Sequence, residues 1–560
     1  MNTLTGMGVS PGVGFGPGYV FSRDVPVPDP GARHQGDAGA ERVRATRALE
    51  QVAADLEERG IRAGGQAQEI LKAQALMARD PGLAVGVAEL IDTGATAARA
   101  VYEGFGAYRE MLVGAGGYLG ERAADLDDVR DRVVAVLEDL PPSGLPAKGA
   151  RPYVLIARDL APADTAALSK DVVAAFVTEE GGPTSHTAIL ARTMGIPAVV
   201  ACAGAASIAA GTLVLVDGST GFVRLAPSEE EVTTVTRAAA ARQAVLAAAT
   251  GPGTTSDGHA VPLLANIGGP RDLDGALRFG AEGVGLYRTE FLFLDRTSAP
   301  AEEEQLVAYM EVLKAFPGGQ VVVRTLDAGA DKPLGFLPPP GREPNPALGL
   351  RGIRLYKKYP EIMNVQLRAL ARAAARSSAK LQVMAPMVAT VEETAWYVAA
   401  CEDAGLPSAG VMIEIPSAAL RAADLAGEAD FFSIGSNDLA QYTFAADREG
   451  GALTALQDPW QPALLDLVAL AVAGAAEHGR ACGVCGEAAG DPVMACVLVG
   501  LGATSLSMAP PALPAVRAAL SLHTRDQCIL AAQAALAEVS PVEARAAARA
   551  HLPGLAGLAL

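Results

Sequence analysis

The sequence predicts an α/β multidomain protein in which a small α/β domain carries an inserted helical bundle and precedes a (β/α)₈ barrel. Charged residues recur at helical spacing between residues 36 and 140, where strand signals are absent. Short β-rich runs then surround a Gly-rich loop, which is typical of a small α/β domain. After residue 254, eight β-like runs alternate with helix-compatible segments, which is the order expected of a (β/α)₈ barrel.

The chain opens with a predicted strand within residues 1–22, where Gly and Pro alternate with apolar residues. An isolated strand requires a sheet, so we expect this one to join the α/β domain at residues 144–226. The helical region at residues 30–141 is then an insertion, which a cluster of prolines ends.

A single helix is predicted over residues 227–251. It begins with Ser228 and three glutamates, which suit the positive end of a helix dipole, and a Gly-Pro-Gly sequence ends it. We interpret this helix as a linker to the barrel at residues 252–560.

Polar residues at the ends of the β-like runs predict where the site of the barrel lies. The runs are VPLLANI, GVGLYRTE, QVVVRTLDAG, LQVMAPMV, GVMIEIPS, DFFSIGSND, ACGVCGE and TSLSMAP. In most of them the polar or reactive residues come last, namely Asn266, Arg288, Glu290, Arg324, Asp327, Glu414, Asn437, Asp438, Cys485 and Glu487. Because barrel active sites are built at the C-terminal ends of the strands, this pattern predicts one polar mouth.

The composition argues against several kinds of partner and cellular location. A formal net charge of −18 argues against nucleic acids and anionic membranes as partners, because both reward clustered Lys and Arg, and it is compatible with a basic protein partner. The longest uncharged stretch, residues 493–516, contains several Gly and Pro and is a poor membrane-spanning helix. No signal-peptide pattern is visible, and 6 cysteines in 560 residues are too few for a disulfide scaffold, so we expect a cytoplasmic protein.

Three arginines at the predicted barrel mouth, Arg288, Arg324 and Arg448, could form a cationic clamp. Guanidinium groups match the oxygens of carboxylates and phosphates. Arg351 could add a fourth cation. Taken singly, each arginine would more often form a surface salt bridge, but their joint placement at strand ends favours a shared site.

Two carboxylates at neighbouring strand ends, Glu414 and Asp438, are hard oxygen ligands. Two carboxylates together with a substrate phosphate are the usual way of holding Mg²⁺. Asn437 could bind an anion or a water molecule. This group therefore predicts a small phosphorylated acid bound together with Mg²⁺.

Cys482 and Cys485 form a Cys-x-x-Cys pair, but no second pair of ligands lies nearby, so the pattern does not favour zinc. The simplest interpretation is two buried small apolar side chains. Cys485 nevertheless falls at a predicted strand end, where a thiol could give a proton to carbon or take one from it.

A second candidate site lies in GGPTSHTAILARTMG, where His186 stands at the predicted start of a helix. Free N–H groups and the positive dipole end there favour a phosphate, and an imidazole at such a place could accept a phosphoryl group. A lone histidine is more often structural, but the preceding glycines and the Thr-Ser-His-Thr sequence favour a functional role.

Long ordered blocks run along the whole chain, namely GGPTSHTAILART, GLYRTEFLF, VVVRTLDAGADKP, NPALGLRGIRL, VMIEIPSAAL, FFSIGSNDLAQYTFAADR and GVCGEAAGD. They resemble the signature blocks of enzyme I of the bacterial sugar phosphotransferase system, a phosphoenolpyruvate–protein phosphotransferase. The resemblance implies transfer of the phosphoryl group of phosphoenolpyruvate to a histidine of the enzyme and then to the carrier protein HPr, with release of pyruvate.

The resemblance also implies roles for domains and residues. A swivelling phosphohistidine α/β domain would carry the histidine, the inserted α-helical bundle would dock HPr, and the C-terminal TIM barrel would form a homodimer. Matched residue by residue, the family's sites fall on His186 as the phosphorylated residue, on Arg288, Arg324, Asn437, Asp438 and Arg448 for phosphoenolpyruvate, on Glu414 and Asp438 for Mg²⁺, and on Cys485 as the acid that protonates the methylene carbon.

Two positions depart from the family pattern. Pro183 stands where many relatives have Arg, which bears on the phosphate contacts near His186. Gln74 stands where a His is often found, which bears on the docking of HPr.

Three alternative functions would each predict a different feature in the sequence. A relative of pyruvate phosphate dikinase or phosphoenolpyruvate synthase would need a large nucleotide-binding region, for which the part before the barrel leaves no room. A nitrogen-linked paralogue would usually carry an additional N-terminal sensory domain. A non-catalytic phosphorylation sensor would be expected to have lost a clamp or metal residue, and none is missing.

Overall fold

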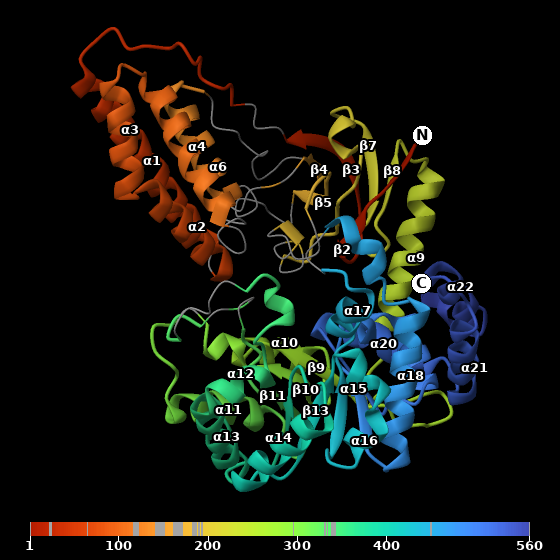
Figure 1. The fold of residues 1–560 in the computed structure, drawn as a ribbon. Coiled ribbons are helices and arrows are strands. Elements are labelled where there is room, and N and C mark those ends of the chain that lie inside the picture. Colours follow the sequence, from red (N-terminus) through yellow and green to blue (C-terminus); the bar gives the residue numbers. More distant parts are fainter. Residues whose placement is uncertain are drawn as a thin grey trace. The chain divides into compact units, whose positions relative to one another are not determined.

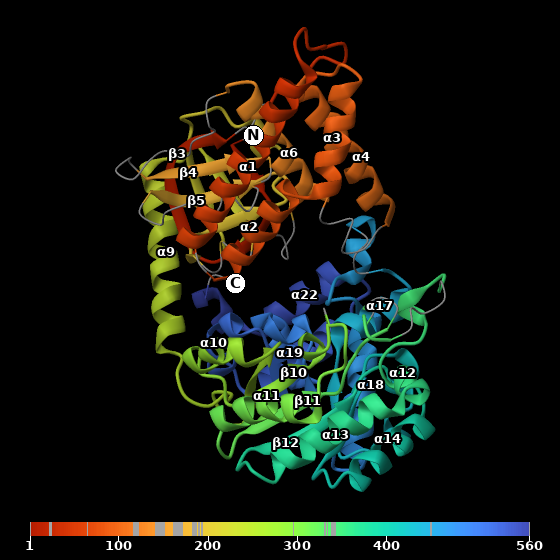
Figure 2. The same ribbon diagram turned by 90° about the vertical axis from the view of Figure 1, so that its left-hand side faces the viewer.

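The computed structural model describes residues 2–21, 25–63, 65–115, 123–140, 152–158, 160, 172–181, 187–188, 191, 194–294, 296–329, 332, 334–337, 343–447 and 451–558. The chain forms two compact units, residues 1–239 and residues 240–560, which are described separately (Figures 1 and 2). The boundaries of the four domains expected from the sequence remain predictions.

The first unit contains a sheet of eight strands in the order β1-β8-β7-β3-β4-β5-β6-β2. The strands are β1 (Thr3–Thr5), β2 (Met7–Ser10), β3 (Val13–Phe21), β4 (Tyr153–Ala157), β5 (Val173–Thr178), β6 (Ala198–Val200), β7 (Leu213–Asp217) and β8 (Phe222–Leu225). Strand β3 pairs in parallel with β4 and antiparallel with β7. The opening strand therefore joins the sheet formed by residues after 150, as the sequence predicted.

Strand β4 shows why this sheet is apolar on both faces. All five of its residues are buried. Tyr153, Leu155 and Ala157 belong to one apolar core, whereas Val154 and Ile156 belong to another. Alternate side chains of a strand point to opposite faces, so the two cores lie on the two sides of the sheet.

The same unit contains the predicted helical insertion, formed by α1 (Ala38–Ala63), α2 (Gly65–Ala78), α3 (Pro81–Asp92), α4 (Ala97–Ala115) and α6 (Ala123–Leu137). Its core contains Leu56, Leu71, Ile91 and Phe105, none of which is more than 1% exposed. The Asp80 side chain accepts a hydrogen bond from the Leu83 N–H at 2.9 Å and so caps α3.

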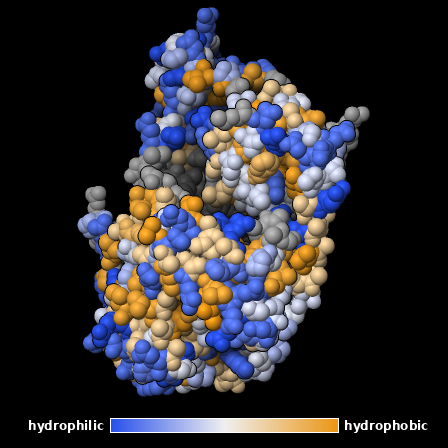
Figure 3. Space-filling view, turned by 90° about the vertical axis from the view of Figure 1, so that its right-hand side faces the viewer, coloured by the Kyte–Doolittle hydropathy of each residue, from blue (hydrophilic) through white to orange (hydrophobic). Residues whose placement is uncertain are grey.

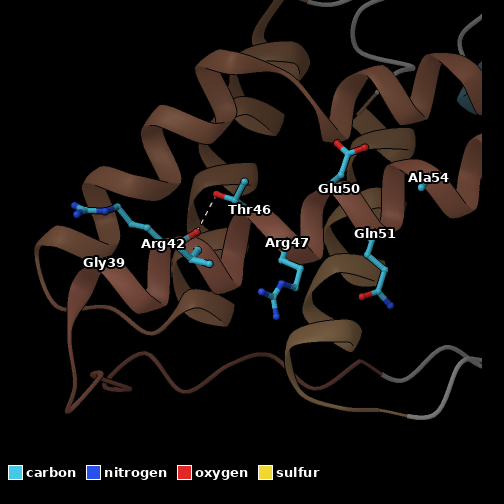
Figure 4. A pocket seen from close by; sticks show the side chains of 8 residues that line it. Gly39, Arg42, Thr46, Arg47, Glu50, Gln51 and Ala54 are labelled. Atoms are coloured by element: carbon cyan, nitrogen blue, oxygen red, sulfur yellow. Dashed lines mark hydrogen bonds between the residues drawn. The ribbon is translucent and has the colours of Figure 1, made fainter.

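The outer face of α1 carries a shallow groove (Figure 4). Its lining residues are Gly39, Arg42, Val43, Thr46, Arg47, Glu50, Gln51 and Ala54. The groove combines both signs of charge, with Arg42 and Arg47 near Glu50.

Helix α9 (Glu229–Ala248) confirms the single helix predicted before the barrel. The Ser228 N–H donates to the Glu231 carboxylate at 2.8 Å, and the Glu231 N–H donates back to the Ser228 hydroxyl at 3.2 Å. This reciprocal pair satisfies backbone groups at the helix start, where the helix has no internal acceptor for them.

The second unit is a closed barrel of eight strands, each paired in parallel with its neighbours. The strands are β9 (Leu263–Ile267), β10 (Val284–Arg288), β11 (Gln320–Arg324), β12 (Lys380–Ala385), β13 (Ala409–Ile413), β14 (Phe431–Ile434), β15 (Ala481–Val484) and β16 (Ser505–Met508). Six lie within the runs predicted from the sequence, and β12 and β13 begin one residue before theirs, so the barrel prediction is confirmed.

Helices surround the barrel (Figure 2). They are α10 (Leu273–Arg278), α11 (Glu302–Ala315), α12 (Ile353–Lys358), α13 (Pro360–Ala374), α14 (Val391–Asp403), α15 (Pro416–Leu420), α16 (Ala422–Ala426), α17 (Ser436–Phe444), α18 (Pro462–Glu477), α19 (Pro492–Gly500), α20 (Leu513–Ser521), α21 (Arg525–Leu536) and α22 (Pro541–Ala550). Short 3₁₀ helices include η3 (Glu290–Leu292), η5 (Gly451–Gln457), η6 (Glu487–Gly490) and η8 (Pro553–Leu558).

Apolar side chains are also present outside the barrel core. In the space-filling view, orange apolar patches alternate with blue hydrophilic ones on the barrel unit (Figure 3).

Among the described residues, one helical stretch, Ala455–Glu477, is long and apolar enough to cross a membrane, and half of its most apolar window is buried inside the protein. The uncharged stretch at residues 493–516 divides into α19, β16 and the start of α20, so it forms no continuous helix.

Candidate active site

Two of the predicted clamp arginines are direct neighbours. Arg288 and Arg324 end β10 and β11 and are paired in register across these adjacent strands. Arg288 is exposed, whereas Arg324 is only 6% exposed. Both therefore lie at the C-terminal end of the barrel, where the sequence predicted a polar mouth.

Arg324 is surrounded by carboxylates. Its guanidinium lies 3.0 Å from Glu290, 3.2 Å from Asp327 and 3.7 Å from Glu414. Burial alone would lower the pKa of Arg324, but these acidic neighbours outweigh the burial and raise it. The guanidinium is therefore a fixed positive charge at the base of the mouth.

Arg351 is a second buried cation, with 2% of its surface exposed. Its Nε and one Nη donate to the two oxygens of Asp327 at 2.9 and 2.8 Å. The other Nη donates to Asp438 at 3.0 Å and to the Tyr442 hydroxyl at 3.1 Å. Asp327 also lies 3.4 Å from Lys332 Nζ, so one carboxylate joins three cationic side chains.

Glu414 directly follows β13 and is 1% exposed. Burial, followed by repulsion from Asp438, raises the pKa of Glu414 to about 7. The Met387 N–H donates to its carboxylate at 3.0 Å, and Met387 holds an unusual left-handed backbone with a φ of 62°. A Cβ added at Gly435 would lie 2.8 Å from the Glu414 carboxylate, so only glycine leaves room for this side chain.

This carboxylate pair fits a divalent cation. Burial and then repulsion from Asp438 disfavour the charged form of Glu414, and a cation beside the two carboxylates would offset both effects. Among the residues that the structure describes, no group of three or more His, Cys, Asp or Glu side chains is arranged to hold a metal. Two carboxylates with oxygens from substrate and water are nonetheless a common way of binding Mg²⁺.

Cys485 follows β15 and is 2% exposed. Its Sγ–H donates to the Ile434 carbonyl at 3.5 Å, and its side chain packs in an apolar cluster with Met384 and Met412. Burial raises the pKa of the Cys485 thiol to about 11. The thiol is therefore protonated at neutral pH, which suits a proton donor better than a nucleophile.

Asn437 lies in the first turn of α17 and is partly buried. Its side-chain oxygen accepts a hydrogen bond from the Glu487 N–H at 3.1 Å. The amide nitrogen of Asn437 is then the group that could donate to an anion.

Some predicted residues lie outside the part of the chain that the structure describes, namely His186, Arg448 and Pro183. Thr187, the next residue after His186, is 1% exposed, and its hydroxyl donates to the Leu160 carbonyl at 3.2 Å. Thr187 is therefore anchored inside the α/β domain.

Gln74 does not lie on a surface. It is fully buried between α2 and α6, and its amide donates to Asp125 at 3.2 Å. The sequence linked this position to HPr docking, but a buried side chain can affect docking only through the packing of the bundle.

Sequence reasoning missed several residues of the mouth. Glu290 and Asp327 had been recognised as polar strand-end residues, but not as partners of the arginines. Lys332, Tyr442, Met387 and Gly435 were not singled out. Lys332 lies inside the block VVVRTLDAGADKP, so a signal for it was present in the sequence.

Comparison with known proteins identifies the family of the chain. Family models of PEP-utilising enzymes match three parts of the chain: the N-terminal region at residues 5–122, the mobile domain at 149–221 and the PEP-binding domain at 242–525. A phosphoenolpyruvate-protein phosphotransferase of Streptomyces coelicolor is 58% identical over 556 residues and covers 99% of both chains. The chain belongs to this phosphotransferase family.

Relatives with the same name from Haloferax volcanii and Bacillus subtilis are 43% and 40% identical. These matches cover 93% and 94% of the chain, and 94% and 95% of the relatives. The resemblance stated from the sequence is therefore confirmed, and the enzyme is a phosphotransferase that uses phosphoenolpyruvate.

Proposed function

We propose that the enzyme transfers the phosphoryl group of phosphoenolpyruvate to its own His186 and then to a carrier protein, HPr, and releases pyruvate. This would be the first step of the sugar phosphotransferase system. The observation that carries the proposal is the barrel mouth, where fixed guanidinium groups, a carboxylate pair and a protonated thiol lie at the ends of neighbouring strands.

The charge of the mouth explains why a cation would be needed. Of the described residues, the buried carboxylates Glu290, Asp327, Glu414 and Asp438 outnumber the buried guanidiniums of the mouth, Arg324 and Arg351. Arg288 and Lys332 add two cations at the mouth, so the charges of the protein balance and the substrate brings the negative charge that remains. Mg²⁺ held by Glu414 and Asp438 would neutralise that charge and the charge on the transferring group.

In this mechanism, Arg288 and Arg324 bind the phosphate of phosphoenolpyruvate, and Arg448 and Asn437 hold the substrate beside them. Phosphoryl transfer depends mainly on positioning and on neutralisation of charge. His186 attacks phosphorus through a neutral ring nitrogen, so transfer should become slower as the pH falls below about 6.5. The P–O bond to the leaving enolate breaks while the P–N bond to His186 forms.

Cys485 then completes the reaction. The enolate carbon takes the proton from Sγ, so a C–H bond forms, the S–H bond breaks and the enolate becomes the ketone of pyruvate. The thiolate regains a proton from solvent, which its raised pKa favours.

His186 has to meet two partners, the barrel mouth and HPr. It belongs to the first unit and the barrel to the second, with α9 containing the boundary between them. A swivelling movement that reorients the phosphohistidine domain would satisfy both steps.

The proposal also includes the protein partners of the enzyme and its location in the cell. HPr would dock on the helical insertion, and the barrels of two copies would form a homodimer in the cytoplasm. Strongly exposed apolar side chains on the barrel unit, such as Val539 and Val542, are compatible with a further protein surface. Nucleic acids and membrane insertion are not part of this function.

The function is tested with HPr purified from the same source. With phosphoenolpyruvate and Mg²⁺, we expect catalytic amounts of enzyme to phosphorylate HPr and to form one pyruvate per phosphoryl group. Pyruvate formation that does not depend on HPr, or phosphorylation that requires ATP, would contradict the proposal.

The role of Cys485 has its own test. Cys485→Ala should slow pyruvate formation by a factor on the order of 10² to 10⁴, the usual contribution of a positioned general acid. Cys482→Ala is a matched control, because Cys482 is also buried (1% exposed) but lies three residues earlier on β15. An equal rate in the Cys485 variant and the unmodified enzyme would remove Cys485 from proton transfer.

A further inference from the structure

A polar pair lies inside the barrel beside Cys485, at positions that a barrel normally fills with branched apolar side chains. Ser507 on β16 is 3% exposed, and its hydroxyl donates to the side-chain oxygen of Asn266 on β9. The Asn266 amide nitrogen donates to the Cys485 carbonyl at 2.8 Å and to the Ser507 carbonyl at 3.4 Å. Asn266 ended a predicted strand in the sequence, yet the proposed function gives it no role.

The connection spans three strands. In the barrel β16 lies between β15 and β9, so the Asn266 amide reaches across β16 to the end of β15. Gly285 on the neighbouring β10 leaves space for the pair, because a Cβ added there would lie 2.5 Å from the Ser507 hydroxyl. The interior is therefore shaped to hold these two side chains.

Together these contacts fix the backbone at Cys485 from both sides. The Cys485 N–H donates to the Ile434 carbonyl at 3.0 Å, and the Cys485 carbonyl accepts from Asn266. Buried polar groups are costly unless they are hydrogen-bonded. Here the Ser507 hydroxyl donates to the Asn266 oxygen, and the Asn266 amide nitrogen donates to the carbonyls of Cys485 and Ser507. The rate at which a carbon atom is protonated depends on the position of the proton donor. A displacement of about 1 Å can slow such a reaction by a factor of about 10².

We propose that Asn266, oriented by Ser507, is a positioning residue that aims the Cys485 thiol at the methylene carbon of the enolate. The inference rests on the proposed function, because it assumes that Cys485 is the acid. In the step concerned, the C–H bond forms as the S–H bond breaks, and solvent later returns a proton to the thiolate. Asn266 supplies no proton and only holds the donor in place.

The test compares Asn266→Asp, Ser507→Ala and Cys485→Ala with the unmodified full-length enzyme. Asn266→Asp keeps the shape but replaces the donating NH₂ by an oxygen that faces two carbonyls. Asn364→Asp is the matched control, since Asn364 is an exposed residue of α13 in the same unit. Each variant receives phosphoenolpyruvate carrying one tritium at a defined (Z) position of the methylene carbon, with Mg²⁺ in ²H₂O, so that the methyl group of pyruvate carries ¹H, ²H and ³H. Protein labelling, pyruvate release and the configuration of this methyl group are measured.

We expect Asn266→Asp to slow pyruvate release by a factor on the order of 10 to 100, with an unchanged KM for phosphoenolpyruvate. The methyl group should lose its single configuration, because a released enolate is protonated without facial preference, and Ser507→Ala should show the same change more weakly. A merely structural role would lower folding stability without altering this configuration.

The possible failures are distinguishable. If Cys485→Ala is slowed but Asn266→Asp and Ser507→Ala are not, the inference is wrong and the role of Cys485 stands. If Cys485→Ala releases pyruvate at the normal rate, both are wrong. A raised KM with normal release and configuration would make Asn266 a substrate ligand and would also overturn the inference. Should Asn266→Asp fail to fold, Ser507→Ala decides by the same measurements.

Discussion

Replacement of His186 by alanine is expected to abolish labelling of the enzyme by phosphoenolpyruvate. The imidazole is the proposed acceptor of the phosphoryl group, and no backbone group can substitute for it as a nucleophile. The measurement is incorporation of ³²P from labelled phosphoenolpyruvate with Mg²⁺, followed by gel separation under alkaline conditions that preserve phosphohistidine.

His478→Ala provides the control, because His478 is an exposed residue that follows α18 on the barrel unit. It should be labelled at the normal rate. Persistent label on the His186 variant, or loss of label from both variants, would show that the acceptor lies elsewhere.

Glu414→Gln should block phosphorylation by phosphoenolpyruvate and spare the second half of the reaction. The amide keeps the shape of the side chain but removes the negative charge that Mg²⁺ requires, and the loss should be on the order of 10³-fold. Back-transfer of a phosphoryl group from phospho-HPr to His186 does not use the barrel, so it should proceed at the normal rate.

Two further variants test whether the effect of Glu414→Gln is specific to Mg²⁺-dependent binding of the substrate. Gly435→Ala would place a methyl group 2.8 Å from the Glu414 carboxylate and should weaken Mg²⁺-dependent binding of phosphoenolpyruvate, measured by calorimetry. Glu393→Gln is the control, because Glu393 is another largely buried glutamate, 9% exposed, whose carboxylate accepts a hydrogen bond from a backbone group, the Ala389 N–H. Equal loss of both half-reactions in Glu414→Gln would mean that Glu414 is structural.

Much of the barrel could be predicted from the sequence because its signals are local. A β-like run followed by a polar residue identifies both a strand and the end of the barrel on which that residue lies. Arg288, Arg324, Glu414 and Cys485 accordingly end or directly follow the strands that were predicted to carry them.

The pairing inside the mouth could not be predicted in this way. Asp327 meets Arg351 because the long connection between β11 and β12 folds back on itself, with a bridge between Gly329 and Arg351. Sequence spacing contains no information on that contact. The left-handed backbone of Met387 is equally unexpected, since only Gly adopts it readily. The burial of Gln74 and its hydrogen bond to Asp125 could not be predicted either, because they depend on the packing of α2 against α6.

The central claim is that phosphoenolpyruvate phosphorylates His186 directly. The measurement that tests it most directly is to incubate the unmodified enzyme with labelled phosphoenolpyruvate and Mg²⁺, digest it, and locate the modified residue by mass spectrometry. We expect a phosphoryl group on a ring nitrogen of His186, with pyruvate formed in equal amount and no label from ATP. Label on another residue, or label that comes from ATP, would show that phosphoenolpyruvate does not phosphorylate His186 directly.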